Sequence, residues 1–523
     1  MNEEITSKLL SYQLPHMLQL QESLTINDCI LDASDTGTGK TYTALALCKS
    51  MKRKPFIICP KSVIPSWLAV AKHFSMDIFG IANYELLKSC KYYTNDLEKV
   101  VCPYMDKVRV PVDSVKKGKK PPKKAIKEDF IFQLPHDTMV IFDEAHRCKN
   151  YKTVTSRLLL SIKNTKCKIL LLSATITDKI PCFKPFGVVF GFYDDVKKFN
   201  VWMRRKIKMN SVRYRDSTMS DDEIKLEIIH DNIFPNRGSR MKISELGPLF
   251  PKNQVTSQEY LCKDYDKVQK NYDIINEALE DLKNKKMKSH ALGKIVRARQ
   301  KIEMYKVPIF LDLAEEALNN NYSLVIFVNY IETMNMLAHH LKADCLIHGG
   351  QNMDERQSCI DDFQSNRRKI IICIMQAGGV GISLHDIHGG HPRMSLISPT
   401  WSGQDIKQAL GRIHRAGSKS PAMQRIVYCA KTYETKLCTI INDKIRNIDA
   451  INDRDMLGPQ FDKEEYVEIA EDVDHGDNVV KNDDNGANTK TYNKSKKKFT
   501  KKVIKSGKSK KKDEELLHIV KVD

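Results

Sequence analysis

The sequence has 523 residues, of which 41% are hydrophobic and 29% are charged, and this length corresponds to about three or four domains of ordinary size. No stretch reaches the ~18 to 20 apolar residues of a membrane-spanning helix, and the start of the chain lacks the layout of a secretory signal, so we expect no membrane partner. The 14 cysteines are scattered without a Cys-x-x-Cys pair, which favours reduced thiols in a soluble cytoplasmic or nuclear protein.

The formal net charge of +20 is distributed unevenly along the chain. Residues 107–127 hold nine basic residues and one Asp, residues 490–512 hold twelve lysines and no acid, and residues 462–484 hold ten acids and two lysines. Basic runs of this kind indicate a polyanionic partner, and we expect a nucleic acid, with DNA favoured over RNA. The alternatives are that the lysines keep a tail solvated, or that the last run is a nuclear import signal.

The chain is predicted to be an α/β protein with two parallel-sheet domains in tandem. In residues 1–205, short apolar runs alternate with helical stretches, which is typical of buried parallel strands. These runs are Cys29–Leu31, Phe56–Cys59, Met139–Phe142 and Ile169–Leu172. Residues 107–127 contain the pair Pro121-Pro122 among their lysines, and this composition predicts a basic surface loop within the first domain.

Three further parts follow in chain order. Residues 206–305 have helical spacing and many charges, which indicates a mainly helical connector. In residues 306–455 the alternation returns and predicts a second α/β domain, with apolar runs at Leu324–Val328, Cys345–Ile347, Ile370–Ile374, Met394–Ile397 and Ile426–Cys429. Residues 456–523 turn acidic and then lysine-rich, and we expect them to be a disordered tail.

A turn with two glycines lies between the first predicted strand and a helix. It reads Ser34-Asp35-Thr36-Gly37-Thr38-Gly39-Lys40-Thr41. Glycines let several backbone N–H groups face one anion, and the positive end of the following helix adds to the attraction. In such a loop Lys40 holds the β- and γ-phosphates of a nucleotide and Thr41 ligates Mg²⁺. Ser34 stands where the general pattern has glycine, and the alternative is a chance Gly-Thr-Gly-Lys-Thr turn.

The strand predicted over 139–142 ends in two acids, Asp143 and Glu144, which Ala145-His146 follow. An Asp at the end of a strand can hold Mg²⁺ through water, and the next Glu can polarise an attacking water. The alternative is an ordinary acidic strand end. The position of the acids about a hundred residues after the glycine turn favours the catalytic interpretation.

The second α/β domain contains Gln408-Ala409-Leu410-Gly411-Arg412-Ile413-His414-Arg415. Arg412 and Arg415 are three residues apart and are predicted to share a helix face. Two guanidinium groups there would neutralise charge that develops on a transferred phosphoryl group. Spacing alone also fits an ordinary basic helix face.

These motifs, together with Ser173-Ala174-Thr175 and residues 376–381, resemble superfamily 2 helicases and translocases over roughly residues 10 to 445. The resemblance implies two RecA-like domains with ATP in the cleft between them. Tyr12-Gln13, residues 60–67 and residues 432–434 are similar to motifs of the Snf2-like branch. Ser173-Ala174-Thr175 is instead the general helicase form, and the sequence equally resembles DEAH-type helicases of large cytoplasmic DNA viruses, which would place it at a cytoplasmic replication site or in a virion.

The resemblance also implies roles for the matching residues, with ATP and Mg²⁺ as cofactors. Gln13 would read adenine, and Ser173, Ala174 and Thr175 would couple the ATP cleft to the nucleic-acid face. Gly381, Gln408, Arg412 and Arg415 would complete the ATP site from the second domain.

The predicted function is therefore an ATP-dependent helicase or translocase of transcription, replication or repair, with proteins of these processes as further partners. Lys61, Asn329 and Thr400, at loop ends of the sheets, are candidate contacts to phosphate and sugar, for which weak sequence preference is expected. One alternative is a Snf2-type translocase that remodels protein–DNA complexes without separating strands. Another is a non-catalytic nucleic-acid scaffold, which would be expected to lack Lys40 or Glu144.

Overall fold

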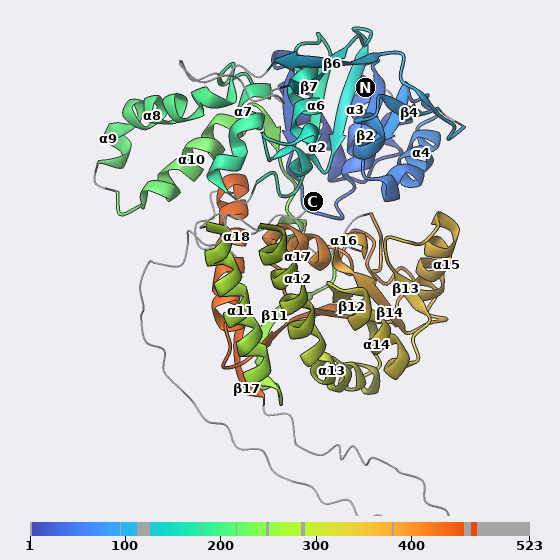
Figure 1. Ribbon diagram of the computed structural model, residues 1–523. Coiled ribbons are helices and arrows are strands. Elements are labelled where there is room, and N and C mark those ends of the chain that lie inside the picture. The colour runs from blue at the N-terminus through green and yellow to red at the C-terminus, as the bar shows by residue number, and fades with distance from the viewer. Residues whose placement is uncertain are drawn as a thin grey trace, which may run out of the picture.

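The computed structural model describes residues 3–94, 96–111, 126–177, 179–215, 217–246, 250–283, 288–378, 381–453 and 462–467. Two large, mainly parallel sheets lie one above the other in Figure 1, and they confirm the predicted α/β class with two RecA-like domains. No helix in the described ranges is both long and apolar enough to cross a membrane. The tail predicted over 456–523 lies outside the described residues, except for the strand at 462–467.

The first sheet has eight strands in the order β10-β1-β9-β8-β2-β3-β4-β5. Neighbouring strands from β10 to β3 are parallel, and β3, β4 and β5 pair antiparallel. The strands are β1 (Cys29–Asp32), β2 (Lys54–Cys59), β3 (Gly80–Asn83), β4 (Lys91–Tyr93), β5 (Lys99–Val101), β8 (Thr138–Asp143), β9 (Lys168–Leu172) and β10 (Gly238–Ser239). The four apolar runs predicted in this region are therefore β1, β2, β8 and β9.

Both faces of this sheet are covered by helices, because successive side chains of a strand point to opposite faces. Phe56 and Ile58 of β2 belong to one apolar core, whereas Ile57 and Cys59 belong to the other. The first core includes side chains of α6 (Val154–Ile162) and α7 (Lys184–Val189). The second includes side chains of α2 (Gln13–Ile26), α3 (Lys40–Ser50) and α4 (Ile64–His73). The short helices α1 (Glu3–Thr6) and α5 (Tyr84–Leu87) complete this part.

Two features extend from the first domain. β6 (Met105–Pro111) and β7 (Ile126–Phe132) form an antiparallel hairpin. The basic run 107–127, predicted to be a loop, thus includes parts of two strands, and residues 112–125 between them lie outside the described residues. The second feature is a helical arm of α8 (Phe199–Met209), α9 (Ser211–Tyr214) and α10 (Asp221–Ile233), which projects to the left in Figure 1.

The second sheet has seven strands in the order β13-β14-β12-β15-β16-β11-β17, and all neighbouring pairs are parallel. The strands are β11 (Asn253–Tyr260), β12 (Ser323–Val328), β13 (Cys345–Ile347), β14 (Ile370–Ile374), β15 (Arg393–Ile397), β16 (Ala422–Cys429) and β17 (Asp462–Val467). The helices of this part are α11 (Tyr265–Lys283), α12 (Lys288–Tyr305), α13 (Val307–Asn319), α14 (Ile331–Leu341), α15 (Met353–Gln364), α16 (Met375–Gly378), α17 (Gly403–Leu410) and α18 (Glu434–Asp453).

The segment 206–305, predicted to be mainly helical, also supplies one strand to each sheet. β10 pairs with β1 of the first sheet, and β11 pairs with β16 and β17 of the second. Its helices α11 and α12 lie beside α18 and the second sheet in Figure 1. The segment is therefore built into both domains.

Candidate active site

The glycine turn predicted to bind phosphate connects β1 to α3. Gly37 (φ 94°) and Gly39 (φ 88°) adopt the left-handed region that glycine favours. Lys40, the first residue of α3, directs its ammonium group into the turn and donates to the carbonyl oxygens of Ser34 (2.9 Å) and Asp35 (3.1 Å). The next residue, Thr41, is half-buried in the first turn of the helix. The turn is thus a backbone cradle with a cation at its centre.

Residues of α2 and of the segment that follows β10 hold the turn in place. The Gln13 amide donates to the Thr38 carbonyl oxygen (3.0 Å), so this side chain lies against the turn as the adenine-reading prediction requires. Asp35 accepts from the Arg240 guanidinium (2.9 Å) and from the Ile243 backbone N–H (3.0 Å), and its pKa is lowered because these groups and Lys407 outweigh the effect of burial. Asp35 therefore stabilises the turn from inside the first domain.

Asp143 is the last residue of β8 and Glu144 follows it, so both acids lie beside this turn. The Trp67 indole donates to Asp143 Oδ2 (2.9 Å), and Glu144 has φ 54° and ψ 50°, a left-handed conformation that is uncommon for a residue with a side chain. His146 Nδ1 lies 3.2 Å from Glu144 Oε2. Strained backbone that the surrounding contacts fix in place is a frequent feature of functional sites.

The two carboxyl groups differ in their affinity for a proton. Burial, and then repulsion from Glu144, raises the pKa of Asp143 to about 6. Burial acts on Glu144 as well, but the hydrogen bond with His146 and attraction by Lys40 and Arg412 outweigh it and lower the pKa of Glu144 to about 2. Glu144 is therefore a carboxylate at neutral pH, which suits a group that orients water.

The second domain contacts these groups across the cleft. The Gln408 amide of α17 donates to Glu144 Oε2 (3.2 Å) and lies 3.3 Å from His146 Nε2. The Ala416 backbone N–H donates to the Gly37 carbonyl oxygen (3.1 Å). A Cβ atom added to Gly37 would lie 2.6 Å from Arg415 Cγ, and one added to Gly411 would lie 2.7 Å from Thr36 Cβ. The predicted residues of both domains thus meet at the glycine turn.

The arginine pair lies beside the turn, but the prediction that it shares a helix face is wrong. α17 ends at Leu410, and Gly411 begins a series of turns that carries both arginines. The Arg412 guanidinium is almost fully buried, and burial lowers its pKa to about 10 although Glu144 and Asp143 attract it. Arg415 donates to the Gly411 carbonyl oxygen (2.9 Å) and to Ser383 Oγ (2.7 Å).

The segment Ser173-Ala174-Thr175 connects the acid pair to the second domain. Ser173 Oγ lies 3.2 Å from His146 Nδ1, and the Thr175 carbonyl oxygen accepts from the Gln404 amide (2.5 Å). Gln404 also accepts from the buried Lys149 ammonium. Gln404 and Lys149 could not be predicted from the sequence, because neither belongs to a motif and only the folded chain brings them together.

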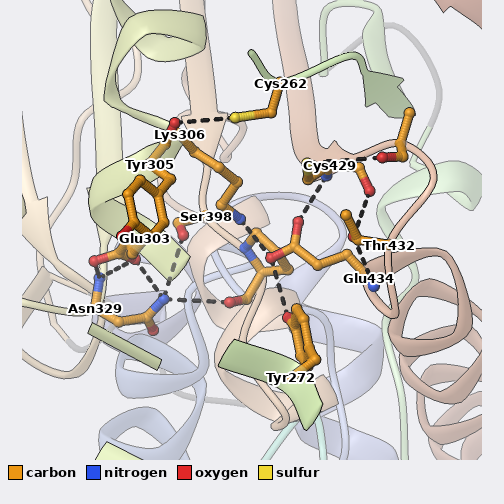
Figure 2. Close-up of polar contacts among 12 residues, drawn as sticks. Cys262, Tyr272, Glu303, Tyr305, Lys306, Asn329, Ser398, Cys429, Thr432 and Glu434 are labelled. Atoms are coloured by element: carbon orange, nitrogen blue, oxygen red, sulfur yellow. Dashed lines mark hydrogen bonds and ion pairs between the residues drawn. The ribbon is translucent and has the colours of Figure 1, made fainter. Parts of the chain in front are cut away.

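Four residues predicted to contact ligands have other surroundings. Gly381 (φ 77°) lies against the first domain, where an added Cβ atom would be 2.3 Å from Val63 Cγ1. Lys61 is exposed just after β2. Asn329 follows β12 and donates to Glu303 (2.7 Å) and to the Pro399 carbonyl oxygen (3.2 Å), as Figure 2 shows in part, and Thr400 is mostly buried. Of the three proposed nucleic-acid contacts, only Lys61 is fully exposed.

Comparisons with known proteins identify the family. A family model for the type III restriction enzyme res subunit matches residues 7–178, and a model for the helicase conserved C-terminal domain matches residues 306–417. A protein of Acanthamoeba polyphaga mimivirus, provisionally named ATP-dependent RNA helicase L364, is 40% identical over 476 residues, which cover 88% of this chain and 87% of that protein. The chain belongs to the superfamily 2 helicases. It is an ATP-dependent helicase or translocase that acts on nucleic acid.

Weaker similarity extends to one bacterial protein and to one solved archaeal structure. The uncharacterized ATP-dependent helicase YqhH of Bacillus subtilis is 21% identical over 83% of this chain and 78% of its own length. Among solved structures, the Sulfolobus solfataricus SWI2/SNF2 ATPase core in complex with dsDNA is 15% identical, with a TM-score of 0.32 over 80% of this helicase and 87% of that chain. The family models and the 40% identity to the mimivirus protein confirm the predicted resemblance to superfamily 2 helicases.

Proposed function

We propose that this helicase hydrolyses ATP between its two domains and uses the resulting opening and closing to step along a nucleic acid, with DNA as the favoured substrate. The observation that carries the proposal is the contact of Gln408 with Glu144, because it joins a polar group of the second domain to the acid that would orient water. A change at the nucleotide would therefore be transmitted directly to the position of the second domain.

In this proposal the first domain binds the nucleotide. Gln13 would face the adenine, and the turn Ser34–Thr41 with Lys40 would hold the phosphates. Mg²⁺ fits the donors present, since the Thr41 hydroxyl and the Asp143 carboxylate are hard oxygen ligands of the kind that bind this ion together with phosphate.

Both domains would supply the remaining groups. Glu144 would orient the attacking water, Gln408 would fix Glu144, and Arg412 and Arg415 would neutralise charge on the transferred phosphoryl group. Release of the transferred phosphoryl group would break the link between the domains. Ser173, Ala174 and Thr175 would pass the movement to the nucleic-acid face through the contact of Gln404 with Thr175.

Glu144→Gln tests the role assigned to the acid. The amide keeps the shape of the side chain but cannot accept a proton, so we expect ATP binding within about threefold of wild type and a fall in kcat of at least ~100-fold. ATP hydrolysis should be measured with single-stranded DNA, duplex DNA and RNA as separate stimulators. The matched control is Glu85→Gln at an exposed position of α5, which should hydrolyse ATP at the wild-type rate. Normal turnover of Glu144→Gln would remove Glu144 from the proposed role.

Strand displacement and triplex displacement distinguish the two kinds of motor. A helicase that separates strands should release a labelled strand from a partial duplex with ATP. A duplex translocase of the Snf2 type should instead displace a third strand and leave the duplex intact. Hydrolysis that no nucleic acid stimulates would contradict both forms of the proposal.

A further inference from the structure

Helix α8 of the projecting arm has an unusual charge distribution. Residues 197–215, which include α8 and α9, contain eight basic residues and no acid. In Figure 1 this part of the arm lies at the side of the molecule, away from the cleft in which the predicted ATP residues meet. Its charge is therefore not explained by the nucleotide site.

Only one face of α8 is used to attach the helix to the domain. Phe199, Trp202 and Met203 are buried in the first core, and the Trp202 ring stacks on Phe192 with the ring centres 5.4 Å apart. The opposite face carries Arg204, Arg205 and Lys208, all exposed. None of these three cations has an ion pair or hydrogen bond within the described part of the chain. The fold thus fixes the helix by its apolar face and presents the basic face to solvent.

The acids of the neighbouring helix do not neutralise this face. α10 carries five acids, yet Glu227 and Asp231 pair with Arg213 of α9, at 2.8 Å for the Asp231 contact. Like charges one helical turn apart destabilise a helix by about 0.2–0.5 kcal/mol, so the pair Arg204 and Lys208 opposes folding of α8 in isolation. An anionic partner would remove this repulsion.

The geometry of α8 fits a duplex. A helix of 11 residues is about 16 Å long, and along that length a duplex presents one phosphate charge per about 1.7 Å of its axis. Val201 and Met209, which are 59% and 68% exposed, flank the cations and would lie against sugar or groove walls. A single helix also matches the width of about 12 Å of the major groove of DNA.

We propose that the outer face of α8, formed by Arg204, Arg205 and Lys208, is an additional contact site for duplex nucleic acid, which it binds through the phosphate backbone. This site rests on the proposed function, because it serves a protein that already moves on a nucleic acid. It would hold the duplex outside the cleft while the two domains change their relative position.

The test is a charge reversal, Arg204→Glu/Arg205→Glu/Lys208→Glu, in the full chain. The matched control, Lys52→Glu/Lys166→Glu/Lys369→Glu, makes the same change in net charge at exposed lysines that precede β2, β9 and β14. Binding of fluorescent duplex DNA, duplex RNA and single-stranded DNA is measured by anisotropy from about 50 to 200 mM salt. We expect the reversal to weaken duplex binding at least tenfold and the control to weaken it less than threefold. The slope of log Kd against log salt concentration should fall by about 2 to 3, since each lost phosphate contact removes about 0.9.

One further variant and one further measurement separate the outcomes. Arg204→Lys/Arg205→Lys keeps the charge and should bind the duplex like wild type, and thermal unfolding checks that the reversal variant is folded. The proposal would be overturned by equal losses of affinity in the reversal and control variants, or by a loss confined to single strands. Unchanged duplex binding would also overturn it and would leave this face to an acidic protein partner. The DNA and RNA arms identify which duplex is bound. Failure of the proposed function is recognised separately, as the absence of nucleic-acid-stimulated hydrolysis by the wild-type protein.

Discussion

Ser34 stands where phosphate-binding turns usually have glycine, and its contacts explain why a side chain is present. Ser34 is fully buried, its Oγ lies 3.2 Å from His16 Nε2, and this oxygen accepts from the Met241 backbone N–H (3.0 Å). His16 also lies 3.1 Å from the buried Asp32, and the pKa of Asp32 is lowered because this attraction outweighs burial. The hydroxyl therefore ties the turn to α2 and to the segment that follows β10.

Ser34→Ala should destabilise the protein. The change removes the acceptor of a buried N–H group, and an unsatisfied buried group costs about 1–3 kcal/mol. We expect the midpoint of urea unfolding, followed by tryptophan fluorescence, to fall accordingly. Ser34→Gly restores the general motif but should be less stable by a further ~0.5–1 kcal/mol, since glycine gains more freedom in the unfolded chain. The exposed Ser89→Ala is the control and should change the free energy by less than ~0.5 kcal/mol. A stable Ser34→Ala would show that water replaces the hydroxyl.

Some residues of the candidate site could be predicted from the sequence, and others could not. Lys40, Asp143 and Glu144 lie near one another as predicted, because each sits next to the end of a predicted strand or helix, and Gln13 was placed beside them by the family resemblance alone. The partners of Asn329 could not be predicted, since Glu303 is distant along the chain and only packing of α12 against the second sheet brings it near. Contacts of this kind depend on tertiary structure and leave no local pattern.

At the scale of elements, apolar strands could be predicted from the sequence, whereas a polar strand could not. All nine runs named from the sequence are strands, because both faces of each are covered. β11 was missed because its sequence, Asn-Gln-Val-Thr-Ser-Gln-Glu-Tyr, is polar, and its first two residues are exposed. The arginine pair was assigned to a helix because spacing cannot reveal that α17 ends before Gly411.

The start of α18 shows how polar groups join elements in the second domain. The buried Lys306 ammonium, between α12 and α13, pairs with the Glu434 carboxylate at 2.8 Å, as seen in Figure 2. Glu434 also accepts from the Cys429 backbone N–H (2.7 Å) and the Tyr272 hydroxyl (3.1 Å). One carboxylate therefore links α11, the junction of α12 and α13, β16 and α18.

Glu434→Gln should destabilise the second domain strongly. The amide leaves the Lys306 ammonium buried beside a neutral group, and breaking one side of a buried pair costs about 3–5 kcal/mol. Lys306→Met/Glu434→Gln should recover most of the loss, because no charge then remains buried. The control is Glu316→Gln, which removes the exposed pair with Arg425 and should cost less than about 1 kcal/mol. Urea unfolding of all three variants provides the measurement, and a double variant as unstable as Glu434→Gln would contradict the charge argument.

At the scale of the whole molecule, the two domains are joined at the residues proposed to be catalytic. Gln408 reaches Glu144, and Gln404 reaches Thr175, from one side of the short helix α17. These side chains are four residues apart and therefore lie on the same helix face. A rotation of α17 would thus move both contacts together, and we propose that this helix transmits the state of one domain to the other.

Gln404→Ala should uncouple the domains while leaving the nucleotide groups in place. The change removes the acceptor for Lys149 and the donor to the Thr175 carbonyl oxygen, both outside the glycine turn. We expect the affinity for ATP to stay within about threefold of wild type, whereas the ratio of kcat with nucleic acid to kcat without it should fall about tenfold, equivalent to ~1.4 kcal/mol of lost coupling. Gln357→Ala, at an exposed position of α15, is the control and should keep the wild-type ratio. If Gln404→Ala retains full stimulation, the contact with Thr175 is only structural and coupling must pass through Gln408 alone. A combined loss of ATP affinity and stimulation would instead indicate that α17 supports the nucleotide site as a whole.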